Sequence, residues 1–213
     1  YVAAGKKWSE KNKKLFKNPY AQYVKIETDF TKTWQLGLHS QLVGHLNAGL
    51  GICFGNSNDL PFSERFYVGG ANSVRAFPLR SIGPGRFEGD FKGNRQMSYL
   101  LQNGDVKFQA NLEYRQRLFG NLHGAVFLDA GNVWLRKDID LGVREISDLF
   151  DDSKFRFGDF FKQMAVGTGV GLRYDLDFLI LRLDWGVGLH VPFETTKSGF
   201  YNIDRFSRYQ TLH

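Results

Sequence analysis

The chain has 213 residues, a net charge of +6 and a hydrophobic fraction of 42%. No apolar run approaches the roughly 20 residues of a membrane-spanning helix, and a single cysteine, Cys53, excludes an intrachain disulfide framework. Acidic and basic residues are interspersed, and we interpret the one basic run, Lys11–Lys17, as a solvated loop rather than a nucleic-acid site.

The composition nevertheless suits a membrane protein built of strands. Such strands alternate lipid-facing and lumen-facing residues, so their average composition is polar. Aromatic residues make up 15% of the chain, and aromatic residues form girdles at the membrane interfaces of barrels. The chain begins without an initiator methionine or a signal peptide, and we expect it to be an internal fragment of a longer protein.

Alternation with a period of two predicts six complete strands. In the clearest one, Val106, Phe108, Ala110, Leu112 and Tyr114 share one face and charged or amide residues share the other. In chain order, the predicted strands are Tyr23–Leu36, Gln41–Phe54, Asp105–Leu118, Gly124–Leu135, Gln163–Tyr174 and Phe178–Val191.

The length of these strands and the character of their polar faces favour a transmembrane barrel. A tilted transmembrane strand needs about 9–11 residues, whereas strands of soluble proteins more often have about five or six. The polar faces are rich in glycine and charge, which is typical of a hydrated lumen. A soluble β-sandwich is the alternative.

The connections alternate strictly between short and long, so all short turns should lie at one end and all long loops at the other. The short ones are 37–40, 119–122 and 175–177, and the long ones are 6–20, 55–103, 136–160 and 192–207. Bacterial barrels place the short turns in the periplasm and the long loops outside. The same rule predicts partial strands at Tyr1–Gly5 and Arg208–His213. In lipid, such an open sheet must close, pair with further strands or associate with another copy.

The longest loop contains Gly69, Gly70, Ser73, Val74, Arg75, Ala76 and Phe77, followed by Gly83 and Pro84. This segment resembles the signature loop of the BamA-like superfamily, which has a double glycine, Ser-Val-Arg-Gly-Phe/Tyr and then Leu-Gly-Pro. Ala76 departs from the family glycine, and the change adds strain only where the backbone needs a positive φ.

The resemblance continues through the two strands that follow. Asn111–Arg115 (Asn-Leu-Glu-Tyr-Arg) and Phe127–Trp134 (Phe-Leu-Asp-Ala-Gly-Asn-Val-Trp) are similar to the family's strands after the signature loop. In the family, the loop folds back into the barrel and its arginine meets acidic residues of these strands. The resemblance therefore implies that Arg75 pairs with Glu113 and Asp129. In the alternative, Arg75 is a solvated loop residue and the acids pair with Arg115, Arg117 or Lys107.

The resemblance implies an all-β protein: an antiparallel meander of about eight strands, six complete, spanning 1–213 as the C-terminal part of a sixteen-stranded barrel in the outer membrane of a Gram-negative bacterium. The POTRA repeats, the first barrel strands and one side of the seam would lie upstream. The family inserts client β-barrel proteins into the membrane or secretes partner proteins, and we favour insertion. The alternatives are a two-partner secretion pore and a barrel that anchors an upstream enzymatic or lipid-handling domain.

The expected partners are outer-membrane lipid and client barrel proteins or a secreted partner, and accessory assembly lipoproteins are also consistent with the family. Neither the single cysteine nor the five histidines occur at spacings typical of a nucleophilic or metal site, and there is no Gly-x-Ser-x-Gly elbow. We therefore expect no catalytic residue, metal or cofactor, and we interpret the chain as part of a non-enzymatic barrel.

Overall fold

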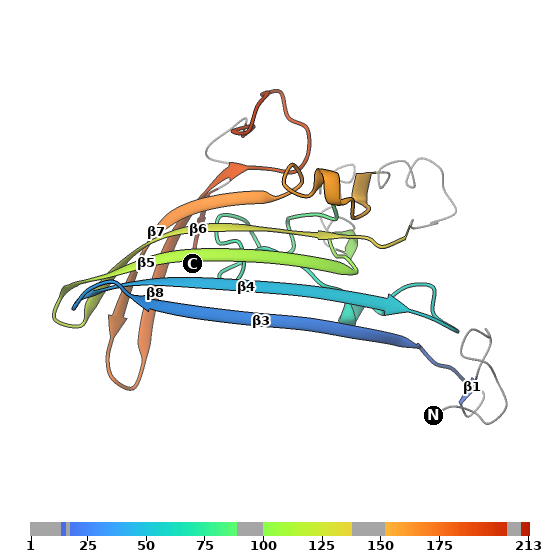
Figure 1. Ribbon diagram of the computed structural model, residues 1–213, viewed down its shortest axis with the longest axis horizontal. Helices are drawn as coiled ribbons and strands as arrows, with labels where there is room; N and C mark the ends of the chain where they lie inside the picture. The colour runs from blue at the N-terminus through green and yellow to red at the C-terminus, as the bar shows by residue number, and fades with distance from the viewer. Residues whose placement is uncertain (1–13, 16–17, 89–99, 138–151, 204–209) are drawn as a thin grey trace.

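The structure is a computed structural model that describes residues 14–15, 18–88, 100–137, 152–203 and 210–213. It consists mainly of one antiparallel sheet (Figure 1). The seven strands follow one another in chain order: β3 (Tyr23–Gln35), β4 (Ser40–Cys53), β5 (Val106–Phe119), β6 (Leu122–Trp134), β7 (Ala165–Asp175), β8 (Ile180–His190) and β9 (Gln210–Leu212). The short strands β1 (Lys14–Leu15) and β2 (Asn18–Pro19) pair with each other. Two 3-10 turns, η1 (Phe62–Glu64) and η3 (Phe157–Asp159), lie in the connections.

The six predicted complete strands are confirmed, and no boundary differs from the prediction by more than two residues. The predicted partial strand at the end of the chain is present as β9, which pairs with β8. The other predicted partial strand, Tyr1–Gly5, lies outside the described residues. Strands β3 and β9 form the two edges of the described sheet, which does not close. No helix in the described ranges is long and apolar enough to cross a membrane.

The three short connections join β3 to β4, β5 to β6 and β7 to β8, and they lie together at one end of the sheet (Figure 1). In the first of them, Gln35 pairs with Gln41, so the chain reverses within five residues. The long connections leave from the opposite end, as the alternation predicts.

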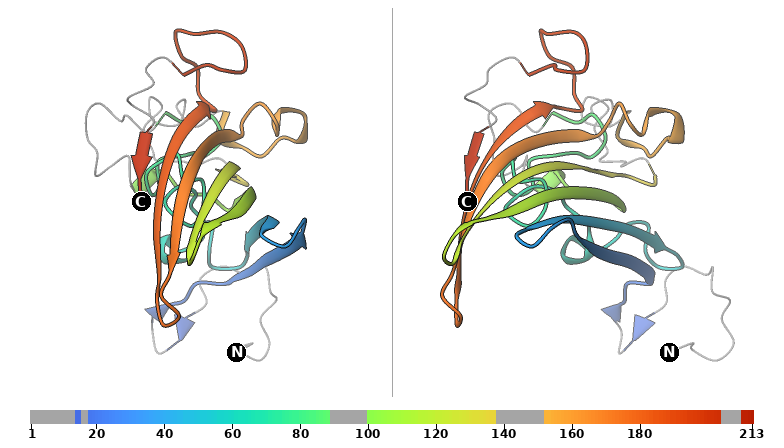
Figure 2. Two further views of the ribbon diagram at one scale, coloured as in Figure 1. Left: turned by 90° about the vertical axis from the view of Figure 1, so that its left-hand side faces the viewer. Right: turned by 60° about the vertical axis from the view of Figure 1, so that its left-hand side comes forward.

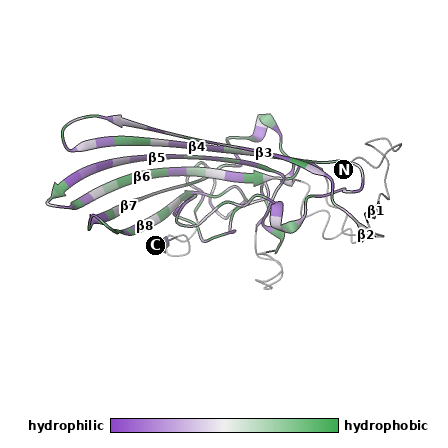
Figure 3. Cartoon of the chain, turned by 90° about the horizontal axis from the view of Figure 1, so that it is seen from below, coloured by the Kyte–Doolittle hydropathy of each residue, from purple (hydrophilic) through white to green (hydrophobic). Residues whose placement is uncertain are grey.

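Hydrophilic and hydrophobic residues are interspersed along each strand (Figure 3), and the two faces of the sheet differ in burial as the alternation predicts. The outer, convex face carries large apolar side chains that no other part of the described chain covers; Phe30 on β3 is 60% exposed and Val126 on β6 is 54% exposed. An apolar surface that extends over six strands is far larger than a soluble monomer tolerates, and contact with lipid satisfies it.

One stretch of β8 departs from the predicted faces. Strict alternation over the predicted strand Phe178–Val191 places Val191 on the lipid face and His190 on the lumen face, but the register between β7 and β8 shifts at Val166 and Gly167. His190 pairs with Val166, and Val191 packs into the interior cluster with 1% exposure. A bulge adds one residue to a strand and thereby exchanges the two faces beyond it, so the prediction was wrong for these two residues.

Candidate functional site

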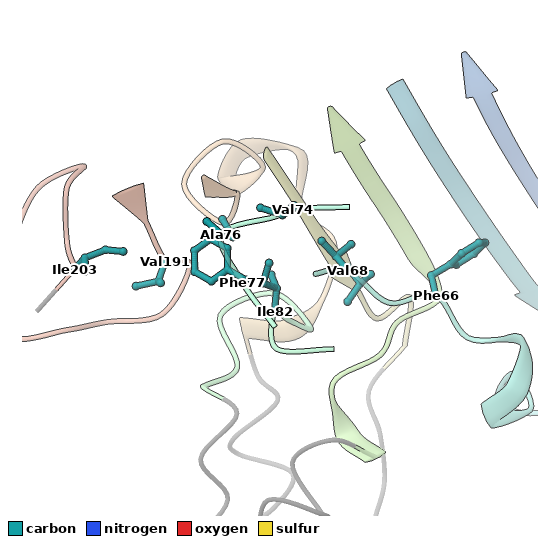
Figure 4. Packing of buried hydrophobic residues seen from close by; sticks show 10 residues of the cluster. Phe66, Val68, Val74, Ala76, Phe77, Ile82, Val191 and Ile203 are labelled. Atoms are coloured by element: carbon teal, nitrogen blue, oxygen red, sulfur yellow. The ribbon is translucent and has the colours of Figure 1, made fainter. Parts of the chain in front are cut away.

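The connection between β4 and β5 turns back into the concave side of the sheet (Figure 2). Its apolar side chains meet residues from β6, β7 and the segment after β8 in the larger buried cluster of the described chain (Figure 4). The members are Phe66, Val68, Val74, Ala76, Phe77, Ile82, Val133, Ala165, Val191 and Ile203. Six of these ten residues (66–82) come from this connection, so the loop itself supplies more than half of the cluster.

The double glycine closes this loop on itself. Gly69 and Gly70 have φ angles of 107° and 91°, which residues with a Cβ atom rarely adopt. A Cβ on Gly69 would lie 2.1 Å from the Pro78 carbonyl oxygen. The Gly70 amide donates to the Phe77 carbonyl at 2.8 Å, so the segment 70–77 forms a closed hairpin-like turn with Arg75 near its tip.

Arg75 is 3% exposed and contacts both acidic residues named in the sequence analysis. Its Nε donates to Asp129 Oδ2 at 2.7 Å and its Nη2 donates to Asp129 Oδ1 at 2.8 Å, a bidentate pair. Its Nη1 donates to Glu113. The Arg75 backbone amide donates to Asp129 Oδ2 at 3.0 Å, so Asp129 holds both the side chain and the main chain of the loop.

The interior contains residues that the sequence analysis missed. The Arg75 guanidinium lies over the ring of Phe127, with Cζ 3.5 Å from the ring centroid. Asp184 on β8, fully buried, lies 3.7 Å from Arg75 Nη1. Arg173 joins Asp184, at 2.6 Å, to Glu113, at 3.2 Å. Alternation places Arg173 and Asp184 on the lumen face, but only the three-dimensional sheet brings them to a loop more than 90 residues earlier in the chain.

Of the three alternative partners of Glu113 and Asp129, only Arg115 contacts one of these acids. Arg115 Nε does donate to Glu113 Oε1, at 2.7 Å. Lys107 instead pairs with Glu27, and Arg117 donates to the Gly120 carbonyl. Glu113 is thus shared among three arginines, whereas Asp129 contacts Arg75 and Asn111.

Burial in this network does not neutralise the loop arginine. Desolvation would lower the pKa of Arg75, but the hydrogen bonds and charges of Asp129 and Glu113 outweigh it and raise the pKa above its usual value. The ion-pair network contains three buried carboxylates (Glu113, Asp129 and Asp184), two buried arginines (Arg75 and Arg173) and two partly exposed arginines (Arg115 and Arg182). The formal charges of these seven groups sum to +1, and each carboxylate lies in at least one ion pair.

Neutral side chains extend the contact along the loop. Ser73 Oγ donates to Gln109 Oε1 at 2.7 Å and accepts the Gly69 amide at 3.2 Å. Asn111 Nδ2 donates to the Ser73 carbonyl at 2.7 Å and to Asp129 Oδ1 at 2.8 Å. The turn and the lumen face of β5 therefore form one hydrogen-bonded unit.

The carbonyl of Arg75 contacts the opposite edge of the sheet. It accepts hydrogen bonds from Thr211 Oγ1 and, at 3.1 Å, from His213 Nε2. Thr211 lies on β9, and the His213 backbone pairs with Asp184 on β8. Arg75 thus joins β5 and β6 through its side chain to the last strand through its main chain.

Glycines on the lumen face form the seat of the loop. A Cβ on Gly167 would lie 2.3 Å from the Ala76 Cβ, and a Cβ on Gly186 would lie 2.9 Å from the Arg75 carbonyl oxygen. We interpreted glycine on these faces as a sign of a hydrated lumen. At these positions the interpretation was wrong, because the loop occupies the space.

The remaining residues of the motif are also buried or constrained. Ala76 is 0% exposed and is not among the non-glycine residues with a positive φ, so replacing the family glycine adds no backbone strain. Gly83 and Pro84 are joined by a cis peptide bond. A Cβ on Gly83 would lie 2.5 Å from Asn132 Oδ1, which brings this second glycine motif against β6.

The titratable groups away from the loop lie in small hydrogen-bonded sets. Within the described ranges, no group of three or more His, Cys, Asp or Glu residues is arranged to hold a metal ion. His45 is bonded to Asp29 and Asn111, and His190 to the Met164 carbonyl.

Comparison with known proteins identifies a family that covers most of the chain. The family model described as "Omp85 superfamily domain" matches residues 10–205. The outer membrane protein assembly factor BamA of Neisseria meningitidis serogroup B is 28% identical over 116 residues, which cover 51% of this chain and 14% of that protein. The chain thus matches a small part of that relative.

Among solved structures, the crystal structure of BamA from Haemophilus ducreyi lacking POTRA domains 1–3 superposes with a TM-score of 0.58 and 22% identity. The superposition covers 78% of this chain and 31% of that one, and it shows a shared fold. CdiB from Acinetobacter baumannii superposes with a TM-score of 0.46 and 19% identity, over 81% of this chain and 24% of that one.

Proposed function

Because the chain belongs to the Omp85 superfamily, whose BamA members are outer-membrane β-barrels, we propose that it is the C-terminal part of a barrel that inserts and assembles other β-barrel proteins in the outer membrane. The observation that carries the proposal is the buried loop arginine, Arg75, bonded to Asp129 and Glu113 on one side and to Thr211 on the other.

The proposed role of the loop is to hold the lumen face and the last strand in one arrangement. Strand β9 pairs with β8 on one side, and its other edge has no partner in the described sheet. An unpaired edge offers backbone groups to which a client strand can add by β-augmentation. A loop that fixes β9 through the Arg75 carbonyl would set the position of that edge.

The test uses the full-length protein reconstituted in liposomes. Folding of a radiolabelled client barrel is measured by protection from protease and by heat-modifiable migration. We expect Arg75→Ala to reduce client folding at least about tenfold, because it leaves the buried Asp129 carboxylate without its cationic partner and releases the loop from β6. Arg115→Ala is the matched control: Arg115 contacts the same Glu113, but its side chain is 40% exposed.

Equal losses in the two variants would contradict the role of the anchored loop. Liposomes that export a soluble partner and fold no client barrel would instead support the secretion pore. A barrel with neither activity would support an anchor for an upstream domain.

A further inference from the structure

A pocket of about 620 Å³ lies at the long-loop end of the sheet, and the turn 70–77 does not line it. Its walls are the loop that follows β8, the pair Phe161 and Lys162 that precedes β7, and Arg86 from the connection between β4 and β5. The volume lies within the range of about 300–1,000 Å³ that is typical of small-molecule sites. None of these residues takes part in the Arg75 network.

The loop that forms the larger wall is held in shape by its own hydrogen bonds. The Asn202 side chain accepts the Val191 amide at 3.0 Å and donates to the carbonyls of Val191 and Phe193 at 3.0 and 3.1 Å. The Phe200 ring stacks on His190, with centroids 4.9 Å apart and an interplanar angle of 16°. The pocket wall is therefore a closed loop clamped at its base.

The charge of the lining is positive. Arg86, Lys162 and Lys197 face one acidic residue, Glu194. Among the described residues, neither Arg86 nor Lys162 forms an ion pair. Two such cations at the edge of one cavity suit a ligand with a phosphate group, because a guanidinium and an ammonium both donate charge-assisted hydrogen bonds to phosphate oxygens.

Two aromatic residues of the lining, Phe161 and Phe200, are exposed, and Phe161 belongs to an aromatic segment beside the lipid-facing surface. Phe160 packs on Phe108 and Trp134, with centroid distances of 5.0 and 5.4 Å, and both residues share the outer face of β5 and β6 with exposed apolar side chains. Phe161 follows directly and is 80% exposed, and Phe157 is 86% exposed. The segment 155–161 thus places aromatic side chains on the outside of the sheet at its long-loop end, and barrels carry aromatic girdles near the ends of their strands.

We propose that this pocket binds a phosphate-bearing lipid of the outer leaflet. The phosphate lies between Arg86 and Lys162, and the acyl chains run down the outer face past Phe161 and Phe200. The positive charges of Arg86 and Lys162 would face the headgroup, and the neighbouring apolar surface would face the acyl chains, which is the arrangement that an amphiphile requires. The proposal depends on the outer-membrane location of the barrel and is independent of the assembly role, so either can fail alone.

The test is native mass spectrometry of the full-length protein in dodecyl maltoside, titrated with didecanoyl phosphatidic acid. The phosphate-free didecanoyl glycerol and inorganic phosphate are titrated in parallel. We expect a saturable adduct with the phosphatidic acid and none with didecanoyl glycerol or inorganic phosphate. Arg86→Gln/Lys162→Gln should raise its Kd by about tenfold or more. Lys32→Gln/Arg117→Gln, which removes two positive charges near the short turns, should leave the Kd within about twofold of the original value.

Heat-modifiable migration establishes that each variant is folded. Phe161→Ser provides a second test that cannot be explained by misfolding, because the side chain is largely exposed; it should weaken the binding of phosphatidic acid and leave the thermal midpoint unchanged. An unchanged Kd in Arg86→Gln/Lys162→Gln, or equal losses in the two double variants, would overturn the proposal. Equally tight binding of inorganic phosphate or of didecanoyl glycerol would also overturn it, because the site would then recognise an anion or a chain alone.

Discussion

The contact between Ala76 and Gly167 offers a direct test of how the loop is seated. In Gly167→Ala, the new Cβ would lie 2.3 Å from the Ala76 Cβ. Carbon atoms in contact are about 3.5–4.0 Å apart, so the loop would have to move by roughly 1.2–1.7 Å. A shift of that size lengthens the 3.0 Å bond from the Arg75 amide to Asp129 beyond hydrogen-bonding range.

Overpacking of this kind costs about 1–3 kcal/mol, which corresponds to a roughly 5- to 150-fold increase in the population of the released loop. Hydrogen exchange of the amides of 70–77 in the full-length protein measures that population. Ala76→Gly removes the opposing methyl, so Ala76→Gly/Gly167→Ala should recover most of the protection. Gly158→Ala is the control, because a Cβ there meets no atom within 4 Å. A double variant that exchanges as fast as Gly167→Ala would refute this account of the seat.

Three further predictions concern groups around the loop. Asp184→Asn should lower stability by about 3–5 kcal/mol, because Arg173 and Arg182 lose a buried charge; a comparable fall in the thermal midpoint for the exposed Asp29→Asn would contradict this. Thr211→Val should cost about 0.5–1.5 kcal/mol and speed exchange in the loop, and no change in exchange would exclude the link to β9. Burial raises the pKa of Asp105, which lies just before β5, so ionisation disfavours the fold. The stabilising contribution of the neutral Asp105 carboxyl is present below about pH 4 and is lost as the pH rises through the raised pKa. Asp105→Asn should therefore raise the thermal midpoint at pH 8 and leave it unchanged at pH 3.5. Equal shifts at the two pH values would contradict this.

The strands could be predicted closely because one local property determines them. Residues such as Ile26 and Phe30 must face lipid, and their neighbours must not, so alternation alone locates each strand and orients its faces. The same reasoning fails where the register changes. Nothing in the stretch before His190 marks a bulge in a single sequence, because Gly188 is compatible with both an extra residue and a regular strand.

The candidate site could be predicted only in part, and the missing part is nonlocal. The contacts of Arg75 with Glu113 and Asp129 follow from the resemblance of the motif and two neighbouring strands. The contacts with Asp184 and the carbonyl contacts with Thr211 involve strands far along the chain, and their relation to the loop depends on how strongly the sheet curves. Curvature is a property of the whole sheet, and no single strand pattern contains it.

The lumen face illustrates how a fold can specify a site by leaving out side chains. Arg75 is attracted from several sides at once, because three carboxylates and the ring of Phe127 surround its guanidinium. Attraction alone would allow several loop positions, because Asp129, Glu113 and Asp184 are all within reach of one guanidinium. The bare backbone at Gly167 and Gly186 restricts the choice, because a Cβ at either position would collide with the loop at Arg75 and Ala76. The ion pairs therefore hold the loop against the lumen face, and the missing side chains at Gly167 on β7 and Gly186 on β8 determine its position there.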